Sequence, residues 1–104
     1  KKILEENDWV VELTPKSGDQ GVDLIGSIGT ARVCFQCKRH SQPVGNKAVQ
    51  EVMAGMRYWN GTHAAVVSTS GYTQSAKELS IVTDVKLLAE SELAELKNRL
   101  LAYQ

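Results

Sequence analysis

The chain has 104 residues, 42% of them hydrophobic and 23% charged, and its twelve Lys and Arg residues balance its twelve Asp and Glu residues. This composition is typical of one globular domain, and it excludes disordered, collagen-like and disulfide-scaffold proteins. Zero net charge also removes the simplest argument for a nucleic-acid partner, which is a strongly basic chain.

The apolar runs, the first residues and the cysteines indicate whether the chain spans a membrane, whether it is part of a longer protein and in which compartment it works. No apolar run approaches the ~20 residues that span a bilayer, so we expect no transmembrane segment. The sequence opens at Lys1 with KKILEEN, which is typical of the end of a helix, and we interpret residues 1–104 as a single domain excised from a longer protein. Two cysteines in an ordinary composition favour a reducing compartment, most simply the cytoplasm.

Hydrophobic periods of two and of about 3.6 residues alternate along the chain, which predicts mixed α and β structure. Residues 1–7 are expected to end a helix, and strands are expected over 9–14, 22–28 and 31–38 in an antiparallel meander. The remaining expected elements are a helix over 45–60, a strand over 64–70, a helix over 74–83 after Thr73, a strand over 85–89 and a final helix after Ser91. The apolar run over 64–70 is typical of a strand paired in parallel inside a sheet. The predicted order is αβββαβαβα.

Three polar residues lie in the predicted meander where apolar residues are expected. Asp23 lies in VDLI, and Gln36 and Lys38 lie at the end of VCFQCK. Because side chains alternate across a strand, Gln36 and Lys38 share one face, and Asp23 can approach them from the neighbouring strand. A carboxylate, an amide and an ammonium group are therefore expected to meet at one end of the sheet.

This combination of groups suits phosphodiester hydrolysis. A divalent cation such as Mg²⁺ takes oxygen ligands, which the Asp23 carboxylate, the Gln36 amide and the Cys37 backbone carbonyl could supply. Lys38 could orient a water and offset charge in the transition state. The alternative from spacing alone is an ion pair between Asp23 and Lys38 at a strand edge, with Gln36 as an ordinary polar residue.

Three stretches in order, SGDQGVDLI, VCFQCKRH and PVGNKAVQEV, resemble the catalytic domain of Mrr-type restriction endonucleases, of the PD-(D/E)xK nuclease superfamily. By position, Asp23 matches the metal-binding aspartate and Lys38 the catalytic lysine, while Gln36 stands where the wider superfamily has Glu or Asp. The resemblance implies a restriction-endonuclease-like three-layer α/β/α fold with a mixed sheet. It also implies hydrolysis of double-stranded DNA with Mg²⁺ or Mn²⁺.

The QxK form is familiar in the Mrr-type branch, but a neutral amide should hold Mg²⁺ less tightly than a carboxylate. In related nucleases a glutamate on the first helix often completes the site, and the matching position would lie upstream of Lys1. Gln50 matches a glutamine on the helix after the QxK strand, and its alternative is a solvated helix residue. Arg39, His40 and Lys47 are the candidates for contact with DNA phosphates.

The string Cys34-Phe-Gln-Cys37, with His40 three residues later, suggests zinc or redox chemistry. An offset of three on a strand sends the two sulfur atoms to opposite faces, so they cannot share a metal or form a disulfide. We therefore expect two separately packed core cysteines.

Two further classes of function remain open. One is a nuclease-like domain that binds DNA structurally or cleaves only branched junctions, and the other is a cytosolic protein-interaction or redox module. In the resembled family a separate DNA-recognition domain is common, so specificity is expected to lie outside this chain or to come from a homodimer.

The zero net charge is a cancellation between segments. Residues 32–57 carry five basic residues and one acidic residue, a net charge of +4. Residues 78–95 carry one basic residue and five acidic residues, a net charge of −4. The basic segment contains the QxK strand and the helix after it, where a phosphate backbone would lie. Neutrality therefore does not argue against DNA.

Overall fold

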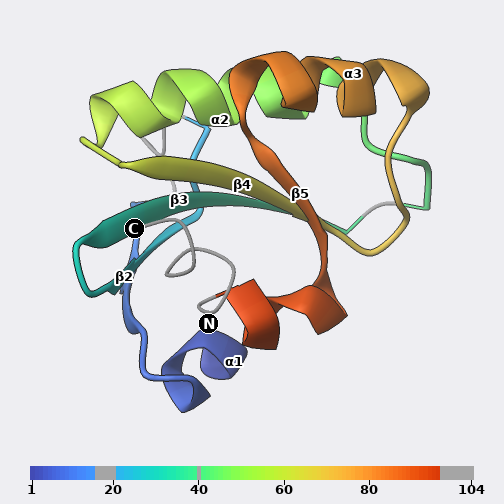
Figure 1. The fold of residues 1–104 in the computed structure, drawn as a ribbon. Helices are drawn as coiled ribbons and strands as arrows, with labels where there is room; N and C mark the ends of the chain where they lie inside the picture. Colours follow the sequence, from blue (N-terminus) through green and yellow to red (C-terminus); the bar gives the residue numbers. More distant parts are fainter. Residues whose placement is uncertain (16–20, 40, 97–104) are drawn as a thin grey trace.

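The computed structural model describes residues 1–15, 21–39 and 41–96 (Figure 1). Its elements in chain order are α1 (Lys2–Glu6), β1 (Val10–Leu13), β2 (Leu24–Ile28), β3 (Ala31–Lys38), α2 (Asn46–Tyr58), β4 (His63–Ser68), α3 (Gln74–Thr83), β5 (Lys86–Ala89) and the 3₁₀-helix η2 (Glu90–Glu95). The predicted order of helices and strands is confirmed.

The five strands form one mixed sheet in the order β1-β2-β3-β4-β5. The first three strands pair antiparallel, as the meander prediction required. β4 pairs in parallel with both β3 and β5, so the strand predicted over 64–70 is an interior strand, although it ends at Ser68. Every β4 residue from Ala64 to Ser68 is buried, which explains why this segment lacks the alternation of a half-exposed strand.

Helices cover both faces of the sheet, which gives three layers (Figure 1). On one face, α2 and α3 pack on a cluster that includes Ile25, Val52 and Val66. On the other face, α1 and η2 pack on a cluster that includes Phe35, Leu88 and Leu96. The predicted three-layer α/β/α class is therefore correct.

Several boundaries differ from the predictions by one or two residues, and two of the differences have local reasons. The second strand begins at Leu24 and leaves Asp23 in a bend just before it. The final helix is a 3₁₀-helix that begins at Glu90, because the Glu92 carboxylate accepts a hydrogen bond of 2.8 Å from the Ala89 N–H. Ser91 as its N-cap was thus wrong, and residues beyond 96 lie outside the described part of the chain.

Tyr72 connects the segment before α3 to the parallel strands. Its hydroxyl lies 2.7 Å from the carbonyl oxygens of both Val66 and Leu88 and accepts a hydrogen bond of 3.1 Å from the Leu88 N–H. Burial raises the pKa of Tyr72 to about 12, so the phenol stays protonated at neutral pH. Within the described residues, no helix has the length and apolar character that a membrane span requires.

Candidate functional site

Asp23 reaches the QxK strand through an irregularity in strand pairing. Leu24 is the register partner of Phe35, yet the Asp23 N–H also donates to the Phe35 carbonyl, at 2.8 Å. Two residues of one chain segment thus oppose one residue of β3, as in a β-bulge, and bulges commonly redirect side chains at sheet ends. One oxygen of the Asp23 carboxylate accepts a hydrogen bond of 2.7 Å from the Cys37 N–H.

The Asp23 backbone is fixed from the opposite side by β1 and the residue after it. The Thr14 N–H donates to the Asp23 carbonyl at 3.2 Å, and the Thr14 hydroxyl lies 3.0 Å from the same oxygen. The carboxylate is therefore held beside the peptide that joins Gln36 to Cys37. This contact brings the Asp23 carboxylate to the backbone of the QxK strand at Cys37.

Gln36 is a buried polar residue near the end of β3. Its side chain lies on the α2 side of the sheet with only 5% exposure, and its Oε1 atom has no hydrogen-bond partner in the described structure. An unpaired buried acceptor carries a desolvation cost of about 1–3 kcal/mol. Such an atom near the end of β3, one residue before the N–H that binds the Asp23 carboxylate, is suited to accept a cation or a proton donor that binds there.

The Cys37 carbonyl is a third oxygen at this position. In a strand, the N–H and C=O groups of one residue point to the same edge, and the Cys37 N–H points to Asp23. The Cys37 carbonyl therefore faces the same edge as the Asp23 carboxylate. Carboxylate, amide and carbonyl oxygens are the donor set that Mg²⁺ and Mn²⁺ prefer, so the residues present fit the implied metal.

The oxygen atoms of Asp23, Gln36 and Cys37 differ from a metal site built of several carboxylate, imidazole or thiolate side chains. Among the described residues, no group of three His, Cys, Asp or Glu side chains is placed to hold a metal ion. A cation at this site would therefore depend on Asp23 together with neutral oxygens.

Lys38 follows on the same side of β3 as Gln36 and lines a cavity of about 340 Å³ at the start of α2. The cavity wall also includes Gly45, Lys47 and Glu51. Gly45 is the N-cap of α2, so the start of this helix, whose first N–H groups have no partner within the helix, borders the cavity. Lys38 makes no ion pair within the described residues, which leaves its ammonium group available to an anion.

Glu51 is a residue of this cavity that the sequence reasoning missed. Glu51 is half-buried. Its backbone packs so closely on Gly21 that a Cβ atom added to Gly21 would lie 2.5 Å from the Glu51 carbonyl oxygen. Gln50, the predicted helix residue, is exposed and is not part of the cavity wall. The available signal was the spacing of Lys47 and Glu51, four residues apart at the edge of the apolar helix face.

The predicted DNA contacts lie at two places around Lys38. Lys47 is exposed and lines the 340 Å³ cavity, whereas Arg39 lines a smaller cavity of about 100 Å³ with Cys37, Lys38 and Glu90. His40 lies outside the described residues.

The two cysteines are unpaired. Cys34 is buried as predicted, but Cys37 is exposed, so the expectation of two core cysteines was wrong for the residue at the open end of β3. Burial raises the pKa of the Cys34 thiol. Partial desolvation of the Cys37 sulfur, and after it the charge of the Asp23 carboxylate, raise the pKa of the Cys37 thiol. A raised pKa lowers the thiolate fraction, which disfavours redox chemistry at CxxC.

The mixed five-stranded sheet with helices on both faces is the architecture that the resemblance implies. The sequence model of the Mrr catalytic domain, described as a restriction endonuclease, matches residues 1–97, and the chain belongs to this family. Among curated proteins, none matches the chain.

Three solved structures share the fold. A protein of unknown function, AF1548, is 19% identical with a TM-score of 0.71 over 86% of this chain and 54% of its own. The MspJI restriction endonuclease in complex with a 27-mer oligonucleotide is 26% identical, with a TM-score of 0.56 over 89% of this chain and 24% of its own. The DNA modification-dependent restriction endonuclease AspBHI is 22% identical, with a TM-score of 0.62 over 88% of this chain and 27% of its own. The chain thus spans about half of AF1548 and about a quarter of the two endonucleases.

Proposed function

We propose that this domain hydrolyses phosphodiester bonds of double-stranded DNA with Mg²⁺ or Mn²⁺ held by Asp23, Gln36 and the Cys37 carbonyl. The observation that carries the proposal is the unpaired, buried Gln36 Oε1, one residue before the Cys37 N–H that holds the Asp23 carboxylate in place. When bound, the cation would supply Lewis-acid activation of a phosphoryl group.

Asp23 has a positioning task besides charge. The Cys37 N–H occupies one carboxylate oxygen, at 2.7 Å, and fixes the orientation of the other oxygen. A ligand whose geometry is set before binding loses less conformational entropy when the cation binds. In the proposed site, the β-bulge at Asp23 therefore preorganises the charged ligand.

Lys38 is proposed to orient the attacking water and to offset charge that develops on the phosphate oxygens. Its half-buried position strengthens this interaction relative to bulk water. Lys47 and the N-terminal N–H groups of α2 line the same cavity and are proposed to bind a neighbouring DNA phosphate. Arg39 and His40 are proposed to contact the backbone further along, and Gln50 to reach toward it from the exposed side of α2.

Glu51 is proposed as a positioning residue in the same cavity. Its carboxylate shares a wall with the ammonium groups of Lys38 and Lys47, and it can hold them in place through electrostatic attraction.

DNA as the partner is supported by the MspJI structure, which contains an oligonucleotide. The two endonucleases are about four times as long as the match, which supports a separate DNA-recognition domain in the full protein. The unpaired cysteines favour a reducing compartment such as the cytoplasm.

The test is nicking of supercoiled plasmid with Mg²⁺ or Mn²⁺, with EDTA as the metal-free condition. We expect metal-dependent nicking that falls at least 100-fold in Asp23→Asn and in Lys38→Ala. Glu78→Gln, which neutralises an exposed carboxylate on α3, is the matched control and should nick like the parent.

Nicking at parental rates by both site variants would show that these residues are not the catalytic centre. Gln36, in place of an acidic ligand, specifically favours a second candidate, a nuclease-fold domain that binds DNA or branched junctions without cutting duplexes. Tight binding to duplex or junction DNA, with no metal-dependent nicking, would establish that alternative.

A further inference from the structure

A turn formed by residues 69–71 at the end of β4 is bonded to the backbone of the QxK strand. Ser68 is the last residue of β4 and the register partner of Lys38 in β3. The next residue, Thr69, donates its N–H to the Lys38 carbonyl at 3.2 Å. The 69–71 turn is therefore attached directly to Lys38.

The same turn is bonded to the segment that leads into α2. The Val44 N–H donates to the Gly71 carbonyl at 2.9 Å. The Ser70 hydroxyl donates to the Gln42 carbonyl at 2.6 Å. Because Val44 directly precedes Gly45, the N-cap of α2, these two bonds fix the place where the helix begins.

The side chain of Ser68 joins the ends of this turn from inside the fold. Ser68 is only 4% exposed. Its hydroxyl accepts a hydrogen bond of 3.0 Å from the Ser70 N–H and donates one of 3.1 Å to the Gly71 carbonyl. That carbonyl is the same one that binds the Val44 N–H. Loss of the hydroxyl would leave a buried donor without its partner and would loosen the support of Val44.

Tyr72 anchors the end of the turn to the sheet. Its hydroxyl lies 2.7 Å from the carbonyl oxygens of Val66 in β4 and Leu88 in β5. Tyr72 also forms an isolated parallel bridge with Val44. The turn can thus serve as a fixed support for the segment before α2, because the sheet sets its own position.

We propose that Ser68 is a positioning residue that sets the start of α2 relative to Lys38. Residues 39–45 connect β3 to α2, and the 69–71 turn is bonded at both ends of this connection. Lys38, Gly45 and Lys47 line the 340 Å³ cavity, so the connection sets the spacing of the groups that would meet one phosphate. The inference rests on the proposed function, and it adds a buried residue that acts through the backbone.

The proposed metal ligands lie on the other side of β3 from this turn. The Asp23 carboxylate is held by the Cys37 N–H, next to β2, whereas Ser68 belongs to β4. Loss of the Ser68 hydroxyl should therefore weaken phosphate binding and leave cation binding unchanged. A general loss of stability would reduce both, because both need the folded domain.

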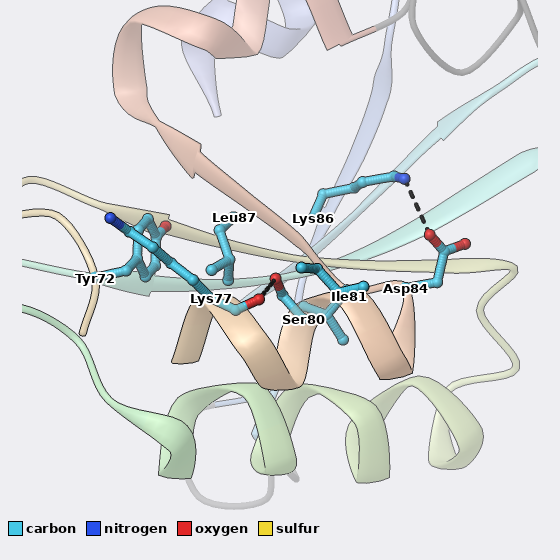
Figure 2. Close-up of a pocket in the computed structure, with 8 residues that line it drawn as sticks. Tyr72, Lys77, Ser80, Ile81, Asp84, Lys86 and Leu87 are labelled. Atoms are coloured by element: carbon cyan, nitrogen blue, oxygen red, sulfur yellow. Dashed lines mark hydrogen bonds and ion pairs between the residues drawn. The ribbon is translucent and has the colours of Figure 1, made fainter. Parts of the chain in front are cut away.

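The test compares Ser68→Ala, Ser70→Ala and Ser80→Ala with the parent in the full chain. Ser70→Ala removes the bond to Gln42 at a half-buried position, so it tests the same turn if Ser68→Ala does not fold. Ser80→Ala is the matched control, because the Ser80 hydroxyl donates to the Lys77 carbonyl at 2.7 Å on α3, beside a groove of about 590 Å³ (Figure 2). Fluorescence anisotropy of a labelled duplex in EDTA measures DNA affinity, and electron paramagnetic resonance measures Mn²⁺ affinity. Amide hydrogen exchange measures the protection of Val44.

Ser68→Ala and Ser70→Ala should each weaken duplex binding about tenfold and speed exchange of the Val44 amide about tenfold, with Mn²⁺ affinity within about twofold of the parent. Ser80→Ala should change each quantity by less than about twofold. Ser70→Thr keeps the hydroxyl and should bind DNA like the parent.

Unchanged exchange of the Val44 amide in both turn variants would overturn the proposal, as would equal losses of Mn²⁺ and DNA affinity. If the parent binds DNA and the two turn variants bind it equally well, this inference alone is wrong. A parent that binds no duplex DNA would contradict the proposed function, and this inference with it.

Discussion

At the scale of single residues, the sequence indicated which polar residues lie near the end of β3 but not their environment. Alternation on a strand placed Gln36 and Lys38 on one face, and the structure puts both on the α2 side. The unpaired state of Gln36 Oε1 was not predictable, because it depends on how α2 and β4 close over the side chain. The partners of Tyr72 were hidden for the same reason, since Val66 and Leu88 become neighbours only in the folded sheet.

Gln36→Glu tests the proposed ligand role of the buried amide. A carboxylate should strengthen Mn²⁺ binding at least tenfold, because it adds a negative charge to the donor set. Without metal, the free energy of unfolding at pH 7 should fall by about 2–3 kcal/mol, since the charge is buried without a partner. Urea unfolding with and without Mn²⁺ measures both effects.

Gln50→Glu is the matched control, because it makes the same change at an exposed position of α2. It should leave stability and Mn²⁺ affinity nearly unchanged. If Gln36→Glu binds Mn²⁺ no better than the parent, the amide is not a ligand.

At the scale of elements, helix positions were predicted well and their contacts less so. The predicted range of α2 is right to within two residues at each end, yet Glu51 rather than Gln50 lines the cavity. Hydrophobic periodicity defines the buried face of a helix, but which flanking residue meets a cavity depends on the neighbouring segment. Here that segment is Gly21, whose contact with α2 brings the start of the Asp23 region against the helix.

Gly21→Ala should therefore be strongly destabilising. Gly21 has φ +77°, and a Cβ would lie 2.5 Å from the Glu51 carbonyl oxygen, so both backbone strain and a clash with main chain oppose the substitution. We expect the free energy of unfolding to fall by about 2–4 kcal/mol. Thermal or urea unfolding measures the loss.

Gly29→Ala separates the two causes, because Gly29 has φ +57° but no atom within 4 Å of the added Cβ. It should cost only about 1 kcal/mol, from the left-handed backbone alone. Equal losses in the two variants would show that the contact between Gly21 and α2 contributes nothing.

At the scale of the whole molecule, the hydrophobic periods of two and about 3.6 residues sufficed to predict the order of strands and helices. Each period shows whether an element buries one face or both, which indicates its place in the sheet or on it. The distribution of charge on the surface was harder to predict, because charged residues that are separated along the sequence are not separated in the same way in the fold. Arg32, in the basic segment, lies near the opposite end of β3 from Lys38, where it pairs with Glu12 at 3.5 Å and donates to the Trp59 carbonyl. Glu90, in the acidic segment, shares a cavity with Lys38.

The basic residues are therefore expected to act individually on DNA. Lys47→Ala should weaken binding to duplex DNA uniformly across sequences and lower the slope of log affinity against log salt by about 1. Arg57→Ala is the control, because its position on the same helix is ten residues, or about 15 Å, further on. Fluorescence anisotropy over a salt series measures both slopes, and an equal change in the two variants would refute a phosphate contact specific to Lys47.

The central claim is that the Asp23 carboxylate and the QxK strand form a cation site. Its most direct test is a Mn²⁺ titration followed by electron paramagnetic resonance on the parent, Asp23→Asn and Lys38→Ala. We predict one bound Mn²⁺ in the parent, at least tenfold weaker binding in Asp23→Asn, and parental or tighter binding in Lys38→Ala, which removes a nearby positive charge. Undiminished Mn²⁺ binding by Asp23→Asn would contradict the account.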